Sequence, residues 1–309
     1  MIIRLILLII AGATAGALSS TPSAPMRNLS PLPEPDIHSA VIHRVYLPLV
    51  LLEDNKPVIG AGATIYGYAT PHRRVYRNVP FYNWGAYPQF CANSNYWPMV
   101  RGQRIAGTIV EACDDGLRLL LVYNEPELGH FSATPAQAAI FLRDWANRWS
   151  GPLACCGNFY ADGGGSLSGL AWFKNFIAEY AVRNGAPPPL AFIHLHVYEF
   201  RQVDTELLKA WRNVADEYGW GVIVSESGTF PTDDYPPVDV AKRLPDFLVT
   251  VENELEPDYL FWFSDFLQPW ALGRETAWHH FNLTNIDNSL TPVGEAWQRY
   301  TGEIIEHQP

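Results

Sequence analysis

The sequence predicts one α/β domain, over residues 57–305, in which eight parallel strands alternate with helices and close into a (β/α)8 TIM barrel. Two observations lead to this prediction. Short apolar strands alternate with helical stretches from about residue 57 onward, which is typical of βα units and a parallel sheet. No Gly-x-Gly-x-x-Gly run follows any of the strands, so an open nucleotide-binding sheet lacks its fingerprint.

The expected elements follow one another in regular order. The eight candidate strands cover 58–65, 79–84, 96–100, 117–124, 153–158, 190–198, 221–225 and 259–264. Helical stretches between them cover 135–149, 170–183, 205–218 and 238–254, and a last helix near 292–300 would close the ring. The first helix has a clear start, with Thr134 as N-cap and Pro135 at the first helical position.

Three segments precede the predicted barrel. Residues 1–17 resemble a secretory signal peptide, because Arg4 precedes an apolar run that ends in small residues with Ala-x-Ala cleavage motifs. The apolar run, 5–18, is short for a bilayer span of about 20 residues, so we expect secretion, with an uncleaved membrane anchor as the alternative. Residues 18–40 are rich in Pro and Ser and indicate a linker. The role of the extended lead-in segment 41–56 stays open.

The composition restricts the class of partner. The chain has a formal net charge of -11, and it contains 11 Trp, 15 Tyr and 15 Phe. An acidic chain is a poor match for nucleic acid or an anionic membrane, because both bind basic patches. A neutral partner fits better, and aromatic richness without basicity is typical of sugar-binding clefts. Most aromatic residues still belong to the core; we expect Trp145, Trp149 and Trp172, on helical stretches, to pack in the outer layer.

The four cysteines are expected to lie in an oxidising compartment if the chain is secreted. Cys91 and Cys113 form the expected disulfide. Cys155 and Cys156 are adjacent in a strand-like run, where alternation directs them to opposite faces, so we predict buried free thiols. No Cys-x2-Cys pair is present, which argues against a metal site.

Two apolar strands each end on a glutamate. Glu125 follows Leu120–Tyr123, and Glu226 follows Gly221–Val224. Burial of an unpaired charge is costly, so such a carboxylate is expected where a strand end opens into a site. Two such carboxylates are what acid/base and nucleophilic hydrolysis of a glycosidic bond needs. The alternative is that both are rim carboxylates held in salt bridges.

Other strand ends also carry polar and aromatic side chains. The second strand ends in Tyr82-Asn83-Trp84, and the eighth contains Trp262. Alternation in the sixth places His194, His196 and Tyr198 on one face. The two histidines have the spacing of a metal pair, but no third ligand stands at a matching strand end. We therefore predict hydrogen-bonded polar histidines and no metal.

The order of these motifs resembles that of clan A glycoside hydrolases, and in finer detail glycoside hydrolase family 128 and the related "glycosyl hydrolase catalytic core" proteins. The resemblance covers about residues 57–301. It departs from the family pattern at Glu127, where Asp is usual. The matching segments are Phe81-Tyr82-Asn83-Trp84, Tyr96-Trp97-Pro98-Met99-Val100, Asn124-Glu125-Pro126-Glu127, His196-Val197-Tyr198, Ser225-Glu226 and Leu290-Thr291-Pro292-Val293-Gly294-Glu295-Ala296-Trp297.

The resemblance implies roles for individual residues. Glu125 would be the acid/base and Glu226 the nucleophile of a retaining mechanism. Asn124 would contact the sugar 2-hydroxyl, and Trp262 would form the floor of the subsite at the cleavage point. Tyr198 is placed to hydrogen-bond the nucleophile. The remaining predicted substrate-binding residues are Tyr82, Asn83, Trp84 and His196.

The expected function is therefore retaining hydrolysis of a β-linked glycan by an endo-β-1,3-glucanase, with the linkage implied by the resemblance alone. The expected partner is a polysaccharide or oligosaccharide, the expected state is a secreted monomer without cofactor, and no stable membrane insertion is expected after signal removal. One alternative is a clan A hydrolase or transglycosylase that acts on another β-glycan, such as mannan or xylan. The other is a non-catalytic carbohydrate-binding barrel.

Overall fold

The architecture was taken from a computed structural model. It describes residues 58–62, 80–82, 84, 90–92, 94–102, 111–128, 132–161, 169–200, 202–230, 236–263, 280–285, 287 and 289–301. The predicted signal peptide, linker and lead-in segment, and Asn83, lie outside these residues. Among the helices that the structure describes, none is long and apolar enough to cross a membrane.

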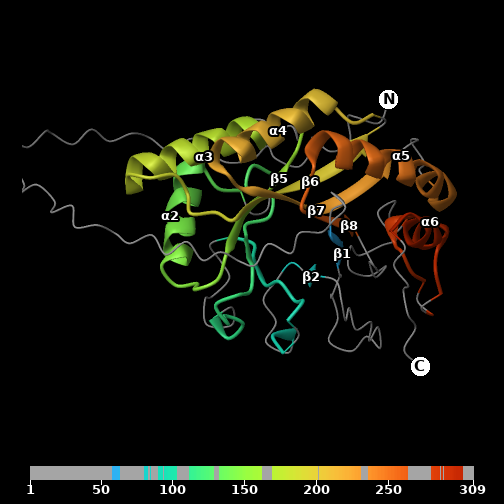
Figure 1. Cartoon of the computed structure of the whole chain (residues 1–309), viewed down its shortest axis with the longest axis horizontal. Coiled ribbons are helices and arrows are strands. Elements are labelled where there is room, and N and C mark those ends of the chain that lie inside the picture. Colours follow the sequence, from blue (N-terminus) through green and yellow to red (C-terminus); the bar gives the residue numbers. More distant parts are fainter. Residues whose placement is uncertain are drawn as a thin grey trace, which may run out of the picture. The chain divides into compact units, whose positions relative to one another are not determined.

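The strands form one parallel sheet, which confirms the predicted α/β class (Figure 1). Its order is β2-β1-β8-β7-β6-β5-β4-β3. The sheet curls, and Phe81 of β2 forms a parallel bridge with Tyr96, shortly before β3. The strands are β1 (Val58–Gly62), β2 (Phe81–Tyr82), β3 (Met99–Val100), β4 (Leu120–Val122), β5 (Leu153–Phe159), β6 (Phe192–Phe200), β7 (Gly221–Phe230) and β8 (Tyr259–Phe263).

Helices connect the later strands, close to the predicted ranges. They are α2 (Pro135–Ala146), α3 (Gly169–Asn184), α4 (Thr205–Tyr218), α5 (Pro237–Leu255) and α6 (Pro292–Thr301). The predicted start of α2 is confirmed: the Thr134 side chain accepts from the backbone of Gln137, whose side chain accepts in return, as in a capping box.

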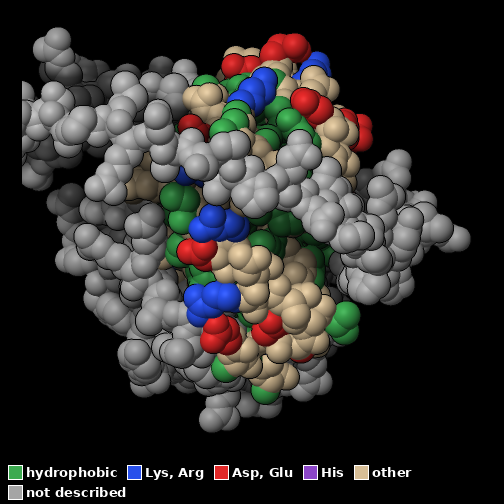
Figure 2. Space-filling view, turned by 90° about the vertical axis from the view of Figure 1, so that its left-hand side faces the viewer, with side chains coloured by type: hydrophobic (Ala, Val, Ile, Leu, Met, Phe, Trp, Pro, Cys, Tyr) green, Lys and Arg blue, Asp and Glu red, His purple; other side chains and the backbone are tan. Residues whose placement is uncertain are grey.

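Acidic and basic side chains lie interspersed on the face shown in Figure 2.

The core has two layers, one on each face of the sheet. The inner layer is lined by Tyr82, Trp84, Trp97, Met99, Leu119, Leu121, Ala154, Ile223 and Phe261. The outer, larger layer lies between sheet and helices, and it holds Trp145, Trp149 and Trp172 as predicted. Alternation explains the division, since Leu121 of β4 faces inward while its neighbours Leu120 and Val122 face outward.

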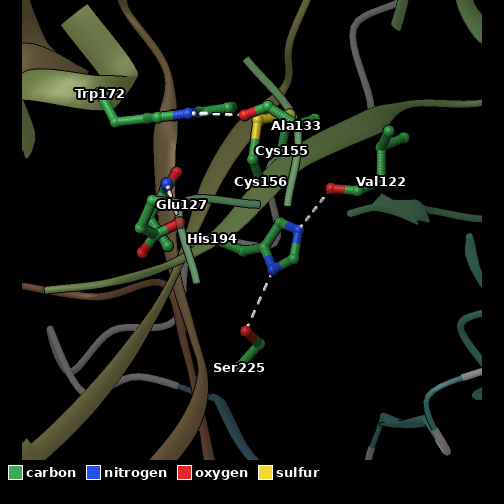
Figure 3. Close-up of a disulfide and its surroundings, with 9 residues drawn as sticks. Val122, Glu127, Ala133, Cys155, Cys156, Trp172, His194 and Ser225 are labelled. Carbon is green, nitrogen blue, oxygen red and sulfur yellow. Dashed lines mark hydrogen bonds between the residues drawn. A yellow bond between two sulfur atoms is a disulfide. The ribbon is translucent and has the colours of Figure 1, made fainter. Parts of the chain in front are cut away.

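The cysteines pair in two disulfides. The predicted bridge between Cys91 and Cys113 is confirmed. The prediction of free thiols at Cys155 and Cys156 is wrong, because a disulfide joins these neighbours (Figure 3). The prediction relied on regular alternation, but the register of β5 against β6 shifts between Cys156 and Asn158.

Candidate active site

Glu125 stands on a tight turn directly after β4. Its φ is 50°, and that of Tyr123 is 70°, so both residues adopt the left-handed region that non-glycine residues rarely enter. The backbone N–H of Glu125 donates to the carbonyl of Gly157 at 2.9 Å. Gly157 itself has a φ of 64°, and a Cβ there would lie 2.9 Å from the His194 ring. Strained turns of this kind cluster at functional sites.

Glu226 lies within β7, at the point where the register of β6 against β7 shifts. Its side chain is almost fully buried and accepts hydrogen bonds from two side chains. The hydroxyl of Tyr198 donates to Oε2 at 2.7 Å, and the indole N–H of Trp84 donates to Oε1. Two donors on a carboxylate favour its ionised form.

His196 lies between the two glutamates. Its Nδ1 is 2.8 Å from Oε1 of Glu125, and its Nε2 is 3.3 Å from Oε1 of Glu226. Burial alone would lower the pKa of His196, but the charges of Glu226 and Glu125 outweigh burial and raise it. An imidazolium can therefore donate its Nδ1–H to Glu125, while its Nε2 lies close enough to Glu226 for an electrostatic contact but makes no hydrogen bond among the described residues.

The charges of this cluster act on one another. Burial is the largest cause that raises the pKa of Glu226, and the Glu125 charge adds to it, while His196, Trp84 and Tyr198 act in the opposite direction. The net result is a raised pKa. Burial and the Glu226 charge also hold the pKa of Tyr198 well above its usual value, so its hydroxyl stays a donor.

Three side chains of this cluster carry groups that can ligate metals. Glu125, His196 and Glu226 each offer an atom within 4.8 Å of the others. The two carboxylates, however, face different ring nitrogens of His196, whose lone pairs diverge in the ring plane. A protonated histidine that bridges two carboxylates fits this arrangement better than one shared ion does.

Two further predicted residues take supporting positions. The Tyr82 hydroxyl donates to the carbonyl of Ser225 at 2.5 Å, directly before Glu226. Tyr82 and His196 were both predicted to bind substrate. Neither has exposed surface, so they hold the glutamates in place and do not line the cleft. Asn124 is half-buried, and its Oδ1 has no hydrogen-bond partner among the described residues.

The prediction for His194 is confirmed. The ring is fully buried, with Nδ1 3.0 Å from Oγ of Ser225 and Nε2 3.0 Å from the carbonyl oxygen of Val122 (Figure 3). Burial lowers its pKa to about 3, so this histidine is neutral. It ties β4, β6 and β7 together beneath the glutamates.

Trp262 corrects a prediction. Its side chain is fully buried in the outer layer, where the indole N–H donates to the carbonyl of Phe281 at 2.8 Å and the ring lies 5.6 Å from that of Trp297. It cannot form the floor of a subsite there. Phe263, the next inward position of β8, lies 5.4 Å from the Trp84 ring and is only half-buried.

Phe263, Asn158 and the carboxyl group of Glu127 were not predicted as parts of the site. Glu127 accepts from the side chain of Asn158 at 2.7 Å and from the backbone N–H of Phe159 at 2.5 Å. The one available signal was Glu127 itself, the position that departs from the family pattern.

A curled parallel α/β sheet with two glutamates at its strand ends fits the hydrolysis of glycosidic bonds, which uses a pair of carboxyl groups. The family model described as "Glycosyl hydrolase catalytic core" matches residues 79–297. The chain therefore belongs to this family of glycoside hydrolases.

Solved structures share the fold at low sequence identity. A family 128 (subgroup II) endo-β-1,3-glucanase from Pseudomonas viridiflava is 21% identical, with a TM-score of 0.55 over 71% of this chain and 88% of that one. A subgroup I endo-β-1,3-glucanase from Amycolatopsis mediterranei, in complex with laminaritriose, is 18% identical, with a TM-score of 0.58 over 79% and 100%. A subgroup III curdlan-specific exo-β-1,3-glucanase from Blastomyces gilchristii is 19% identical, with a TM-score of 0.53 over 80% and 100%. A comparison with curated proteins gave no match.

Proposed function

We propose that this protein is a retaining endo-β-1,3-glucanase, in which Glu226 is the nucleophile and Glu125 the acid/base. The observation that carries the proposal is the pairing of the two glutamates: an oxygen of each lies within 4.8 Å of the other. Retaining glycosidases place their two carboxyl groups about 5–5.5 Å apart, whereas inverting enzymes need about 6.5–9.5 Å to fit a water.

The roles follow from exposure and hydrogen bonding. The Glu226 side chain is 7% exposed and accepts two hydrogen bonds, whereas that of Glu125 is 30% exposed. Glu226 is therefore the group held in a fixed position by hydrogen bonds, as attack on the anomeric carbon requires. Glu125, at the exposed side, gives a proton to the departing glycosidic oxygen and then takes one from the water that hydrolyses the glycosyl-enzyme.

The substrate class rests on the solved relatives. Both endo-β-1,3-glucanases carry that activity in their descriptions, and one holds laminaritriose. A curdlan-specific exo-enzyme is among the similar structures, so exo action on the same linkage is the second candidate. Asn124, with its unpaired buried Oδ1, fits a hydrogen bond from a sugar hydroxyl.

The proposal extends to the organisation of the chain. The hydrogen bonds of Phe81 with Asn95 (3.0 Å) and Trp97 (2.9 Å) support closure of the sheet into the full (β/α)8 barrel, with residues 57–305 as the catalytic domain. The apolar run at 5–18, together with the small residues at its end, supports secretion, with residues 18–40 as a linker. A monomeric state is part of the proposal.

The test is a panel of polysaccharides with reducing-end detection. We expect hydrolysis of soluble and insoluble β-1,3-glucans with a ladder of oligosaccharide products, and little release from mannan or xylan. Product analysis by NMR should show that the β-configuration is retained. Release of glucose alone would favour the exo-enzyme, and activity on none of the glycans would contradict the proposal.

A further inference from the structure

The turn that carries Glu125 rests on the end of β5 through three hydrogen bonds. One joins the Glu125 N–H to the carbonyl of Gly157 at 2.9 Å. The other two end on the Glu127 carboxyl group, where Oε1 accepts from the N–H of Phe159 at 2.5 Å and Oε2 accepts from Nδ2 of Asn158 at 2.7 Å. Glu127 thus connects the β4 turn to both polar donors at the end of β5.

This carboxyl group is closely enclosed. A Cβ at Gly169, the first residue of α3, would lie 1.9 Å from the carbonyl oxygen of Phe159 and 3.4 Å from Oε1 of Glu127. Asn158 has no exposed surface, and its Oδ1 has no partner among the described residues. Glu127 lies among the side chains around Cys155 and Cys156 (Figure 3). The start of α3 and the end of β5 therefore hold the carboxyl group in place.

We propose that Glu127 is a positioning residue for Glu125: its carboxyl group fastens the left-handed turn to β5, and its negative charge supports the imidazolium of His196. The inference rests on the proposed function. A turn that leaves its φ/ψ region would displace the Glu125 carboxyl, and a misplacement of about 1 Å at a reacting group can cost about 100-fold in rate.

Among the residues that the structure describes, the charged groups that act on His196 are three glutamates. Glu125 and Glu127 act on it from the β4 turn and Glu226 from β7, and all three raise its pKa. His194 of the same strand is neutral, and its own pKa is lowered by burial and by the His196 charge. Loss of the Glu127 charge must therefore lower the pKa of His196, which shortens the pH range of the imidazolium on its alkaline side.

The Glu127 carboxyl group can keep its hydrogen bond to Asn158 when it is protonated. Burial raises the pKa of Glu127 to about 7, against the opposing effect of its hydrogen bonds and of the His196 charge. A protonated carboxyl gains an O–H donor, and the unpaired Oδ1 of Asn158 can accept it once the amide turns over. The connection to β5 can therefore persist in both protonation states.

Two variants separate the two parts of the proposal. Glu127→Gln keeps the shape, since its Oε1 can accept from Phe159 and its Nε2 can donate to Asn158 Oδ1, but it removes the charge. Glu127→Ala removes both. The control is Glu179→Gln, which removes the same charge from an exposed i,i+4 pair with Arg183 in α3.

We expect Glu127→Ala to lower kcat by about 10- to 100-fold with KM changed by less than about threefold, because the acid/base is misplaced while sugar contacts stay. Glu127→Gln should lose less than about tenfold in kcat, yet shift the alkaline limb of kcat/KM to lower pH. The control should match the parent in both. The His196 ring, titrated by NMR without substrate, should show a lower pKa in both Glu127 variants and an unchanged pKa in the control.

Several results would overturn the inference. If Glu127→Ala retains the parental kcat, Glu127 does not position Glu125. Glu127→Gln with an unchanged alkaline limb and an unchanged His196 titration removes the charge effect, and this variant carries the test if Glu127→Ala does not fold. A parent inactive on every β-glucan would count against the proposed function instead, and the NMR titration would still decide the Glu127–His196 coupling.

Discussion

Nδ1 of His196 lies 2.8 Å from Oε1 of Glu125, at a position where the histidine has no exposed surface. The opposite ring nitrogen faces Oε1 of Glu226 at 3.3 Å. One cation thus serves two carboxylates, and its charge lowers the pKa of Glu226 against burial. The histidine therefore controls how readily the buried glutamate ionises.

We expect His196→Gln to move the acid limb of kcat/KM to higher pH. Without the imidazolium, Glu226 loses the charge that opposes burial, so its pKa rises and a higher pH is needed to ionise it. The rate should fall by about 100-fold, as for loss of one preorganised donor. pH profiles from 4 to 9 would measure both effects. His194→Asn is the control, because His194 is neutral and its replacement should leave the pH profile of kcat/KM unchanged. An equal shift of the acid limb in His194→Asn would contradict the role given to the His196 charge.

The two glutamates should respond differently to the leaving group. Glu226→Gln should abolish turnover on all substrates, because no nucleophile remains. Glu125→Ala should lose most activity on glucans but keep the first step on aryl glycosides with good leaving groups, which need little protonation. Added azide should then rescue the second step and yield a β-glycosyl azide. Identical behaviour of both variants across leaving groups would leave the role assignment unsupported.

The two histidines of β6 should influence stability in opposite senses. Burial lowers the folded-state pKa of His194 to about 3, whereas an unfolded histidine titrates near pH 6.5. The unfolded state therefore binds one more proton between about pH 6.5 and 3, and acid weakens the fold there by about 1.4 kcal/mol per pH unit. His196, with a raised folded pKa, contributes fully below about pH 6.5 and loses its contribution as the pH rises through the folded value.

His194→Asn should accordingly lose less stability than the parent between pH 7 and pH 4, although it is less stable at pH 7 because the hydrogen bonds to Ser225 and Val122 are disturbed. Urea unfolding across a pH series gives the free energies directly. Parallel pH dependences for parent and variant would show that His194 does not stay neutral in the folded protein.

The sequence was informative where local pattern determines structure. An apolar run that ends on a glutamate located Glu125 and Glu226, because only a strand end near a site tolerates a buried carboxylate. Period-2 alternation placed His194, His196 and Tyr198 on one face, and the structure confirms this. The start of α2 at Thr134 followed from capping rules, which depend on four adjacent residues.

The sequence was not informative where contacts with distant segments determine the orientation of a side chain. Alternation predicts that Trp262 and Phe263 face opposite sides of the sheet, but it does not say which of them faces outward. Trp262 faces outward because its ring packs against Phe281 and Trp297, which follow much later in the chain. Trp84 donates to Glu226 from a left-handed backbone with φ of 52°. Such a conformation is rare for a bulky residue, so no local rule predicts it.

The revised placement of the β8 aromatics gives a paired prediction. Trp262→Ala should lower stability by about 3–5 kcal/mol, the usual cost of a buried Trp truncation, and should lower kcat/KM only modestly. Phe263→Ala should do the reverse, because its half-buried ring lies beside Trp84 and Tyr198, the two donors to Glu226. Thermal melts together with glucan kinetics would measure both. A large loss of activity at normal stability for Trp262→Ala would restore the original prediction.

The two disulfides should differ sharply in their contribution to stability. Cys91 and Cys113 are separated by 22 residues, and closing a loop of that length in the unfolded chain is worth about 3 kcal/mol. Cys155 and Cys156 are separated by 1, so their bond restricts almost no loop. The double variant Cys91→Ala/Cys113→Ala should therefore lose about 3 kcal/mol, and Cys155→Ala/Cys156→Ala only the smaller cost of altered packing.

Urea unfolding with and without a dithiol reductant separates these contributions. Reductant should destabilise the parent and the Cys155→Ala/Cys156→Ala variant by similar amounts, because both keep the long loop. It should have little effect on Cys91→Ala/Cys113→Ala. Thiol counts by mass spectrometry would establish which bonds are present in each sample. If the long-loop variant is as stable as a parent whose disulfides are intact, the loop-closure argument is wrong for this protein, and the contribution of Cys91–Cys113 must be sought in the folded state.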